Sequence, residues 1–169
     1  MKQKNRPSVQ GETVISEDFK IIFDKIILDI DKKKKPEEPF VLGLGGMSTS
    51  GKTTMSINLS NYLNSKGFKT QSIHLDDFHF EKCIRNFNGN QAEVFCDIYF
   101  NISKIINFIL EPLNTRKELN MKLSKMYNYE NDLYDIERDY KIDKETIVIF
   151  EGIFVVLLKA VHHRQHTIR

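Results

Sequence analysis

The sequence has little of what disulfide-bonded, zinc-binding or strongly basic proteins need. Only two cysteines occur in 169 residues, Cys83 and Cys96, and they are too far apart for a CxxC pair and too few for a zinc site. We expect both to be reduced cytosolic thiols, with a disulfide or a reactive thiol as the alternative. The formal net charge is only +2, which gives no electrostatic reason to expect binding to nucleic acid or to a membrane surface.

Long apolar runs are missing too. The longest, residues 147–158, is interrupted by Glu151 and is too short to cross a bilayer. The first ten residues, MKQKNRPSVQ, contain no apolar stretch of the kind that a signal peptide has. These absences predict a cytoplasmic protein of one domain, without a membrane or nucleic-acid partner, and they leave the oligomeric state open.

The most informative segment that is present is GMSTSGKT at residues 46–53, a complete phosphate-binding P-loop. An apolar run at residues 40–44 leads into it, and a helical pattern leaves it and ends near Gly67. Strand, glycine-rich turn and helix form the context that the motif needs, so we prefer this interpretation to a chance Gly-Lys-Thr. Such a loop binds phosphate through backbone N–H groups, while the lysine reaches the β/γ-phosphates and the hydroxyl binds Mg²⁺. The nucleotide-binding residues that we expect are Gly46, Ser48, Ser50, Gly51, Lys52, Thr53 and Thr54.

Two further predicted strands end in acidic residues. Residues 70–75 are followed by Asp76 and Asp77, and residues 146–150 by Glu151. Ligands lie outside the carboxyl ends of the strands in open α/β sheets, so these acids should lie near the P-loop. Adjacent side chains point in different directions, so one aspartate can accept a hydroxyl proton while the other faces a metal or structural neighbours. The alternative for the pair is a simple helix cap. Glu151 has the position of a Walker B acid, which holds Mg²⁺ directly or through water.

A separate helix is predicted before the P-loop. Ser16 is a suitable N-cap, two acids follow it, and apolar residues recur at helical spacing as far as Ile30. Four lysines and a Pro-Glu-Glu-Pro segment at residues 32–39 then break the pattern. We interpret them as a solvated linker rather than a phosphate-recruiting patch. The chain therefore divides into residues 1–39, helix and linker, and residues 40–169, the P-loop domain.

Three segments together resemble the uridine kinase-like branch of the P-loop kinases, which includes uridine-cytidine, nicotinamide riboside and pantothenate kinases and phosphoribulokinase. They read GLGGMSTSGKTT, HLDDFHF and IVIFEGIF, at residues 43–54, 74–80 and 147–154. The resemblance implies a three-layer α/β P-loop fold with a parallel sheet. It also implies ATP- and Mg²⁺-dependent transfer of a phosphoryl group to the hydroxyl of a small metabolite, with a nucleoside such as uridine as the expected acceptor.

The resemblance assigns roles to individual residues. Asp76 is the general base, and Lys52 is the second catalytic residue. Thr53 binds the metal, with Asp77 and Glu151 assisting the metal or the acceptor.

The acceptor site is expected just after the second strand and in the long insertion before the third. The insertion is too long for a plain crossover, and it contains a predicted helix that starts at Asn101 or Ser103 and runs to Leu113. Two tyrosines that follow resemble the family's tyrosine-bearing turn. For each candidate the alternative is a surface polar residue or a packed aromatic. The candidates are His79, Arg85, Asp97, Tyr127 and Tyr129.

The end of the sequence departs from the family. Relatives continue with two more strands, an arginine-bearing lid helix and an adenine-contacting loop, whereas this sequence stops at VHHRQHTIR. We interpret its three histidines as a basic tail rather than a metal site. The expectation is a kinase domain without its C-terminal strands and lid, which binds nucleotide weakly and catalyses poorly. The alternative is a nucleotide-binding remnant or regulatory module with little or no turnover.

Overall fold

The computed structural model describes residues 15–80 and 99–153. The predictions for Arg85, Asp97, the two cysteines and the C-terminal histidines lie outside those ranges. Within them, no helix is both long and apolar enough to cross a membrane.

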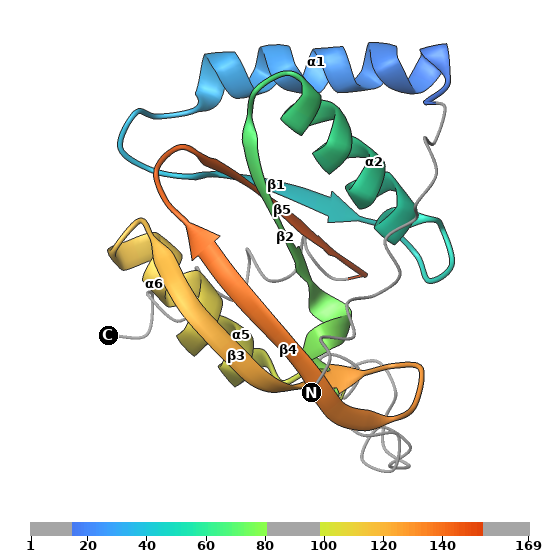
Figure 1. The fold of residues 1–169 in the computed structure, drawn as a ribbon, viewed down its shortest axis with the longest axis vertical. Helices are drawn as coiled ribbons and strands as arrows, with labels where there is room; N and C mark the ends of the chain where they lie inside the picture. Colours follow the sequence, from blue (N-terminus) through green and yellow to red (C-terminus); the bar gives the residue numbers. More distant parts are fainter. Residues whose placement is uncertain (1–14, 81–98, 154–169) are drawn as a thin grey trace.

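The described chain is a three-layer α/β fold, which confirms the predicted class (Figure 1). Its elements, in chain order, are α1 (Glu17–Lys33), β1 (Phe40–Gly45), α2 (Lys52–Ser65), β2 (Lys69–His74), the 3₁₀ turn η1 (Leu75–Phe78), α5 (Ile102–Ile105), the π-helical turn η2 (Ile106–Leu110), α6 (Glu111–Thr115), β3 (Leu119–Asn128), β4 (Leu133–Ile142) and β5 (Thr146–Gly152).

Three parallel strands form the central sheet in the order β1-β5-β2. The P-loop strand β1 thus lies beside β5, which contains Glu151, and the parallel sheet agrees with the predicted fold class. Strand β5 is buried along its whole length, as expected for a central strand covered on both faces. Because the strands run the same way, the P-loop, the two aspartates and Glu151 meet at one edge of the sheet.

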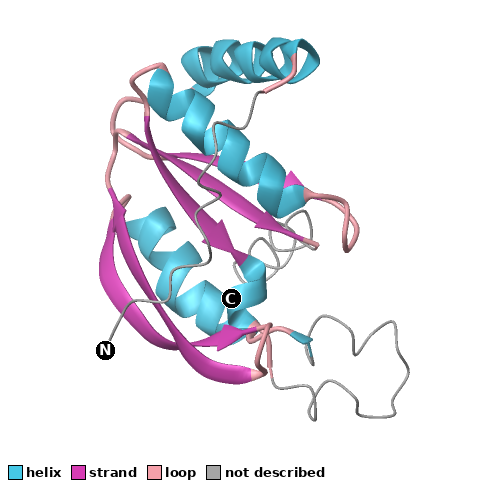
Figure 2. Ribbon diagram, turned by 45° about the vertical axis from the view of Figure 1, so that its right-hand side comes forward, coloured by secondary structure: helices cyan, strands magenta, loops and turns pink. Residues whose placement is uncertain are grey.

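Helices α1 and α2 cover one face of the sheet (Figure 2). Ser16 caps α1 as predicted, since its Oγ accepts a hydrogen bond from the Phe19 N–H. The Tyr62 hydroxyl of α2 donates to Asp24 of α1 at 2.7 Å, so the two helices are also joined by a polar contact. The buried residues shared by α1, α2 and β5 are Phe23, Ile30, Leu59, Leu63, Ile147 and Ile149. The domain boundary at residue 39 stays a prediction, while α1 packs into the same core as the sheet.

The helical segment between Ile102 and Thr115 covers the other face. Asn101 caps it, as one of the two predicted starts, because its Oδ1 accepts from the Lys104 N–H at 2.9 Å. The predicted single helix is instead interrupted by the π-helical turn η2. Pro112 follows directly in α6, and it has no N–H to donate to the carbonyl four residues earlier, which explains the local change in helix type.

Strands β3 and β4 form an antiparallel hairpin that packs on the same side as this helical segment (Figures 1 and 2). The hairpin was not among the predicted elements, and only a turn that bears two tyrosines was expected here. Tyr127 in fact lies within β3 and is buried, whereas Tyr129 follows the strand and is exposed. Alternation is present in residues 119–123 and 136–142, and the register shifts break it only between Leu123 and Asn128.

Candidate active site

The P-loop joins β1 to α2 in a form that suits an anion. Thr49 and Gly51 have φ of 60° and 81°, and such positive angles favour glycine at the second position. A Cβ on Gly46 would lie 2.9 Å from Ser50 Oγ, so the loop closes tightly at that point. In the part of the chain that the structure describes, no side chain caps the 14-residue helix α2. Its first N–H groups are therefore available to a phosphate group.

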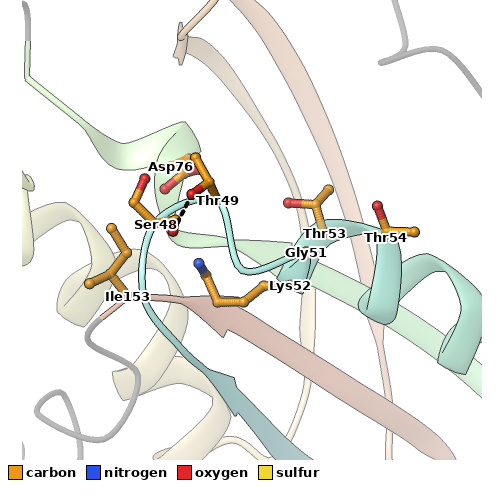
Figure 3. A pocket seen from close by; sticks show the side chains of 8 residues that line it. All are labelled: Ser48, Thr49, Gly51, Lys52, Thr53, Thr54, Asp76 and Ile153. Carbon is orange, nitrogen blue, oxygen red and sulfur yellow. Dashed lines mark hydrogen bonds between the residues drawn. The ribbon is translucent and has the colours of Figure 1, made fainter. Parts of the chain in front are cut away.

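A pocket of about 260 Å³ opens at this loop (Figure 3). Lys52 Nζ donates to the Met47 carbonyl at 2.6 Å, which holds the ammonium group inside the curve of the loop. Asp76 reaches the same pocket from η1, with 37% of its side chain exposed. Gly46 and Ser50 belong to the loop itself. The pocket is lined by Ser48, Thr49, Gly51, Lys52, Thr53, Thr54, Asp76 and Ile153.

Glu151 lies buried next to the P-loop helix, with only 2% of its side chain exposed. The Thr53 hydroxyl donates to Glu151 Oε1 at 3.2 Å, and His74 Nδ1 lies 2.7 Å from the same oxygen. His74 is directly opposite Glu151 in the β2–β5 register. This histidine was not predicted from the sequence. Asp76 and Glu151 were, because both lie at the carboxyl ends of predicted parallel strands, and His74 is the last residue of one of those strands.

These oxygen donors fit a magnesium ion. Thr53 and Glu151 supply a hydroxyl and a carboxylate at the pocket, and Mg²⁺ binds through one or two protein oxygens completed by substrate phosphates and water. No cluster of three or more His, Cys, Asp or Glu residues that could hold a metal occurs within residues 15–80 and 99–153. The donor set therefore suits an ion that arrives with a phosphate ligand better than a metal held by protein alone.

Gly152 leaves room for the turn that contains Asp76 to pack against β5. A Cβ at Gly152 would lie 2.4 Å from Leu75 Cδ1 and 2.5 Å from Leu75 Cβ, closer than carbon atoms pack. Leu75 is the first residue of η1 and precedes Asp76. The glycine after Glu151 therefore lets the aspartate-bearing turn press directly against the end of β5.

The two adjacent aspartates point in different directions, as the sequence predicted. Asp76 faces the pocket, and its Oδ1 lies 3.5 Å from His79 Nε2. The Asp77 side chain is fully buried and accepts from Arg138 Nε at 2.6 Å and Nη2 at 2.9 Å. Burial on its own lowers the pKa of Arg138, but the hydrogen bond and charge of Asp77 outweigh it and raise the pKa. We therefore correct the expectation for Asp77, which is bound to the hairpin and does not line the pocket, and leave it out of the proposed metal site.

Aromatic side chains gather around His79, which is 7% exposed. Its ring meets Phe100 edge-on at 4.2 Å, stacks on Tyr127 at 5.8 Å and meets Tyr129 edge-on at 5.9 Å. The Tyr134 hydroxyl donates to the His79 carbonyl at 3.4 Å. The structure thus brings together three of the residues predicted for the acceptor site, and it adds Tyr134, which the sequence analysis missed because it lies on the unpredicted strand β4.

Known proteins resemble this chain in sequence and in fold. Residues 41–166 match the family described as "Phosphoribulokinase / Uridine kinase family". A 62-residue segment, 36% of this chain, is 41% identical to the uncharacterized kinase mug58 of Schizosaccharomyces pombe and covers 22% of that protein. The chain thus spans less than a quarter of the length of this curated relative.

Solved structures of kinases share the fold. One is a possible uridine kinase from Bacillus stearothermophilus, with a TM-score of 0.64, 23% identity, and coverage of 81% of this chain and 70% of that one. Another is D-glycerate 3-kinase from Cryptococcus neoformans, with a TM-score of 0.53, 17% identity, and coverage of 82% and 53%. At these identities the similarity establishes the fold and leaves the substrate open.

Proposed function

This chain belongs to the phosphoribulokinase/uridine kinase family, and on that premise we propose that it transfers the γ-phosphoryl group of ATP to the hydroxyl of a small metabolite. A nucleoside such as uridine is the first acceptor to test. The observation that supports this proposal is the convergence of Lys52, Thr53 and Asp76 on one pocket, with Glu151 hydrogen-bonded to Thr53. A phosphate-binding loop and a carboxylate that can take a hydroxyl proton are the two parts that this reaction needs.

On the donor side, the loop N–H groups and Lys52 bind the β- and γ-phosphates. The ammonium group now donates to the Met47 carbonyl, so it is already inside the loop where a phosphate oxygen would arrive. Thr53 and Glu151 would hold Mg²⁺, which neutralises charge on the phosphates when bound. The partly buried His74 orients the Glu151 carboxylate through the 2.7 Å contact.

On the acceptor side, Asp76 orients the hydroxyl and accepts its proton. His79 lies 3.5 Å from Asp76 and restricts how the carboxylate can turn. The rings of His79, Tyr127 and Tyr129 lie within about 6 Å of one another. Of these three rings only Tyr129 is exposed, and an exposed aromatic face close to the base favours an acceptor with a planar ring, which supports a nucleoside over a small acyclic acid.

Two single substitutions test the proposal in an assay of ATP-Mg²⁺ with a panel of hydroxyl acceptors. Lys52→Ala should abolish transfer and weaken ATP binding, because the β/γ-phosphate contact is lost. Asp76→Asn should leave ATP binding nearly intact and lower turnover by roughly 10²–10⁴, the range for a lost general base. Lys66→Ala, at the far end of α2, and Asp31→Asn, exposed on α1, are the matched controls and should change neither quantity.

The same assay separates the other interpretations. ATP binding in calorimetry without any phosphorylated acceptor would favour a nucleotide-binding protein without turnover. ATP hydrolysis that no acceptor stimulates would favour an ATPase. Full acceptor phosphorylation by Asp76→Asn would contradict the assignment of the base.

A further inference from the structure

A buried ion pair lies one residue from the proposed base and outside the pocket lining. Arg138 and Asp77 form two parallel hydrogen bonds of 2.6 and 2.9 Å, and their side chains are 16% and 0% exposed. Asp77 belongs to η1, while Arg138 belongs to β4, 61 positions later in the sequence. The pair therefore joins the turn that contains Asp76 to the hairpin.

Fold stability alone gives no strong reason for this pair. Two charges that are buried together lose much of their hydration, and well-packed apolar replacements are often equally stable. What the planar guanidinium adds is geometry, because its two N–H groups fix the plane of the carboxylate that they bind. An orientation imposed on Asp77 is passed to Asp76 through a single peptide unit.

The turn η1 is short, so contacts from outside it matter for its position. It has four residues, and the hydrogen bond that ends it, from the His79 N–H to the Asp76 carbonyl, is 3.4 Å long. The hairpin also binds the turn's far end, since the Tyr134 hydroxyl donates to the His79 carbonyl. The turn is thus attached to the hairpin through Asp77 and His79, on both sides of Phe78 and directly after Asp76.

We propose that Arg138 is a positioning residue for phosphoryl transfer, which holds Asp76 in register with the exposed Tyr129 ring of the hairpin. The inference rests on the proposed function, because it assumes that Asp76 is the base and that the exposed Tyr129 ring faces the acceptor. The base and the acceptor surface then move as one unit, separate from the P-loop, which belongs to β1 and α2.

The test replaces both members of the pair, Asp77→Leu together with Arg138→Met, so that neither charge is left buried alone. This variant should keep ATP affinity within about twofold of the original, while kcat for the acceptor falls on the order of 10²-fold with a smaller change in KM. Arg138→Lys keeps the positive charge but removes the two parallel N–H groups that bind Asp77. The kcat of this variant should be roughly tenfold lower. The control is the exposed cross-strand pair of the same hairpin, Lys122 with Glu137, whose double replacement by Met and Gln should change neither constant.

Hydrogen exchange gives a readout that does not depend on turnover. In the double variant, the amides of His79 and Asn101, which are bonded to η1 carbonyls, should exchange at least about tenfold faster, while the α2 amides stay as protected as before. If the original chain phosphorylates no acceptor, the proposed function fails, and the exchange result alone decides whether Arg138 holds the turn. Should the double variant not fold, Arg138→Lys decides by the same two measurements. Normal kcat in a folded variant, or unchanged exchange at His79 and Asn101, would overturn the inference.

Discussion

Replacing Gly152 by alanine perturbs the proposed active site without touching any group that bonds to a ligand. The added Cβ would lie 2.4 Å from Leu75 Cδ1, 2.5 Å from Leu75 Cβ and 2.8 Å from Leu75 Cγ. Favourable carbon–carbon contacts are about 3.5–4.0 Å, so the end of β5 and the turn η1 must separate by roughly 1 Å. Because one of the three clashing atoms is the Leu75 Cβ, a rotamer change of Leu75 cannot remove the overlap, and the backbone of η1 has to move.

Two magnitudes follow from this displacement. Overpacking of this kind costs about 1–3 kcal/mol in the free energy of unfolding. A shift of about 1 Å in a catalytic group can lower turnover on the order of 10²-fold, and Asp76 directly follows the displaced Leu75. ATP binding should change little, because the P-loop is attached to β1 and α2 rather than to η1.

Urea unfolding, calorimetry with ATP-Mg²⁺ and the acceptor assay measure the three effects. Gly67→Ala is the control, because Gly67 has φ of 90° with no atom within 4 Å of an added Cβ. It should destabilise the fold by about 1 kcal/mol through backbone strain and leave turnover unchanged. Leu75→Ala in the Gly152→Ala background should not restore turnover, since its Cβ remains. A Gly152→Ala protein with undiminished stability and turnover would refute the reasoning.

Two other predictions concern charge. Glu151→Gln keeps an acceptor oxygen for Thr53 but removes the negative charge. Calorimetry with Mg²⁺ and with a chelator should therefore show that the metal increases ATP affinity by a factor roughly tenfold smaller than in the original chain. An unchanged factor would exclude Glu151 from the metal site. Asp143→Asn tests the exposed pair with Lys69. The hydrogen bond from Lys69 holds the pKa of Asp143 below its usual 3.8, so the pair stabilises the fold above that pH and the contribution is lost as the pH falls through the lower, folded-state pKa. Urea unfolding at neutral pH should therefore show a loss of no more than about 1 kcal/mol, and no difference should remain well below pH 3.8; a loss that persists there would contradict the electrostatic explanation.

The local parts of the site could be predicted from the sequence because local chemistry specifies them. The glycines and the Lys52-Thr53 pair of the P-loop act through backbone angles and neighbouring atoms, which a short segment contains in full. Continuous apolar runs identified β1 and β5, and parallel strands necessarily bring their carboxyl ends to one edge. The convergence of the P-loop, Asp76 and Glu151 followed from those two facts.

The partners of the acidic residues depended on distant parts of the chain. Nothing near Asp77 in sequence indicates Arg138, 61 positions away, or distinguishes a metal-binding aspartate from one held by a guanidinium. His74 meets Glu151 across 77 positions only because β2 pairs with β5 in one particular register. The hairpin shows alternation in residues 119–123 and 136–142 that was overlooked, whereas the pairing of its two strands and the register shifts between Leu123 and Asn128 were known only from the fold. The sequence alone therefore determined which phosphate-binding and acidic groups reach the edge of the sheet, whereas the tertiary structure decided what each acid binds, since a carboxylate takes the cation or donor that folding places within about 3 Å of it.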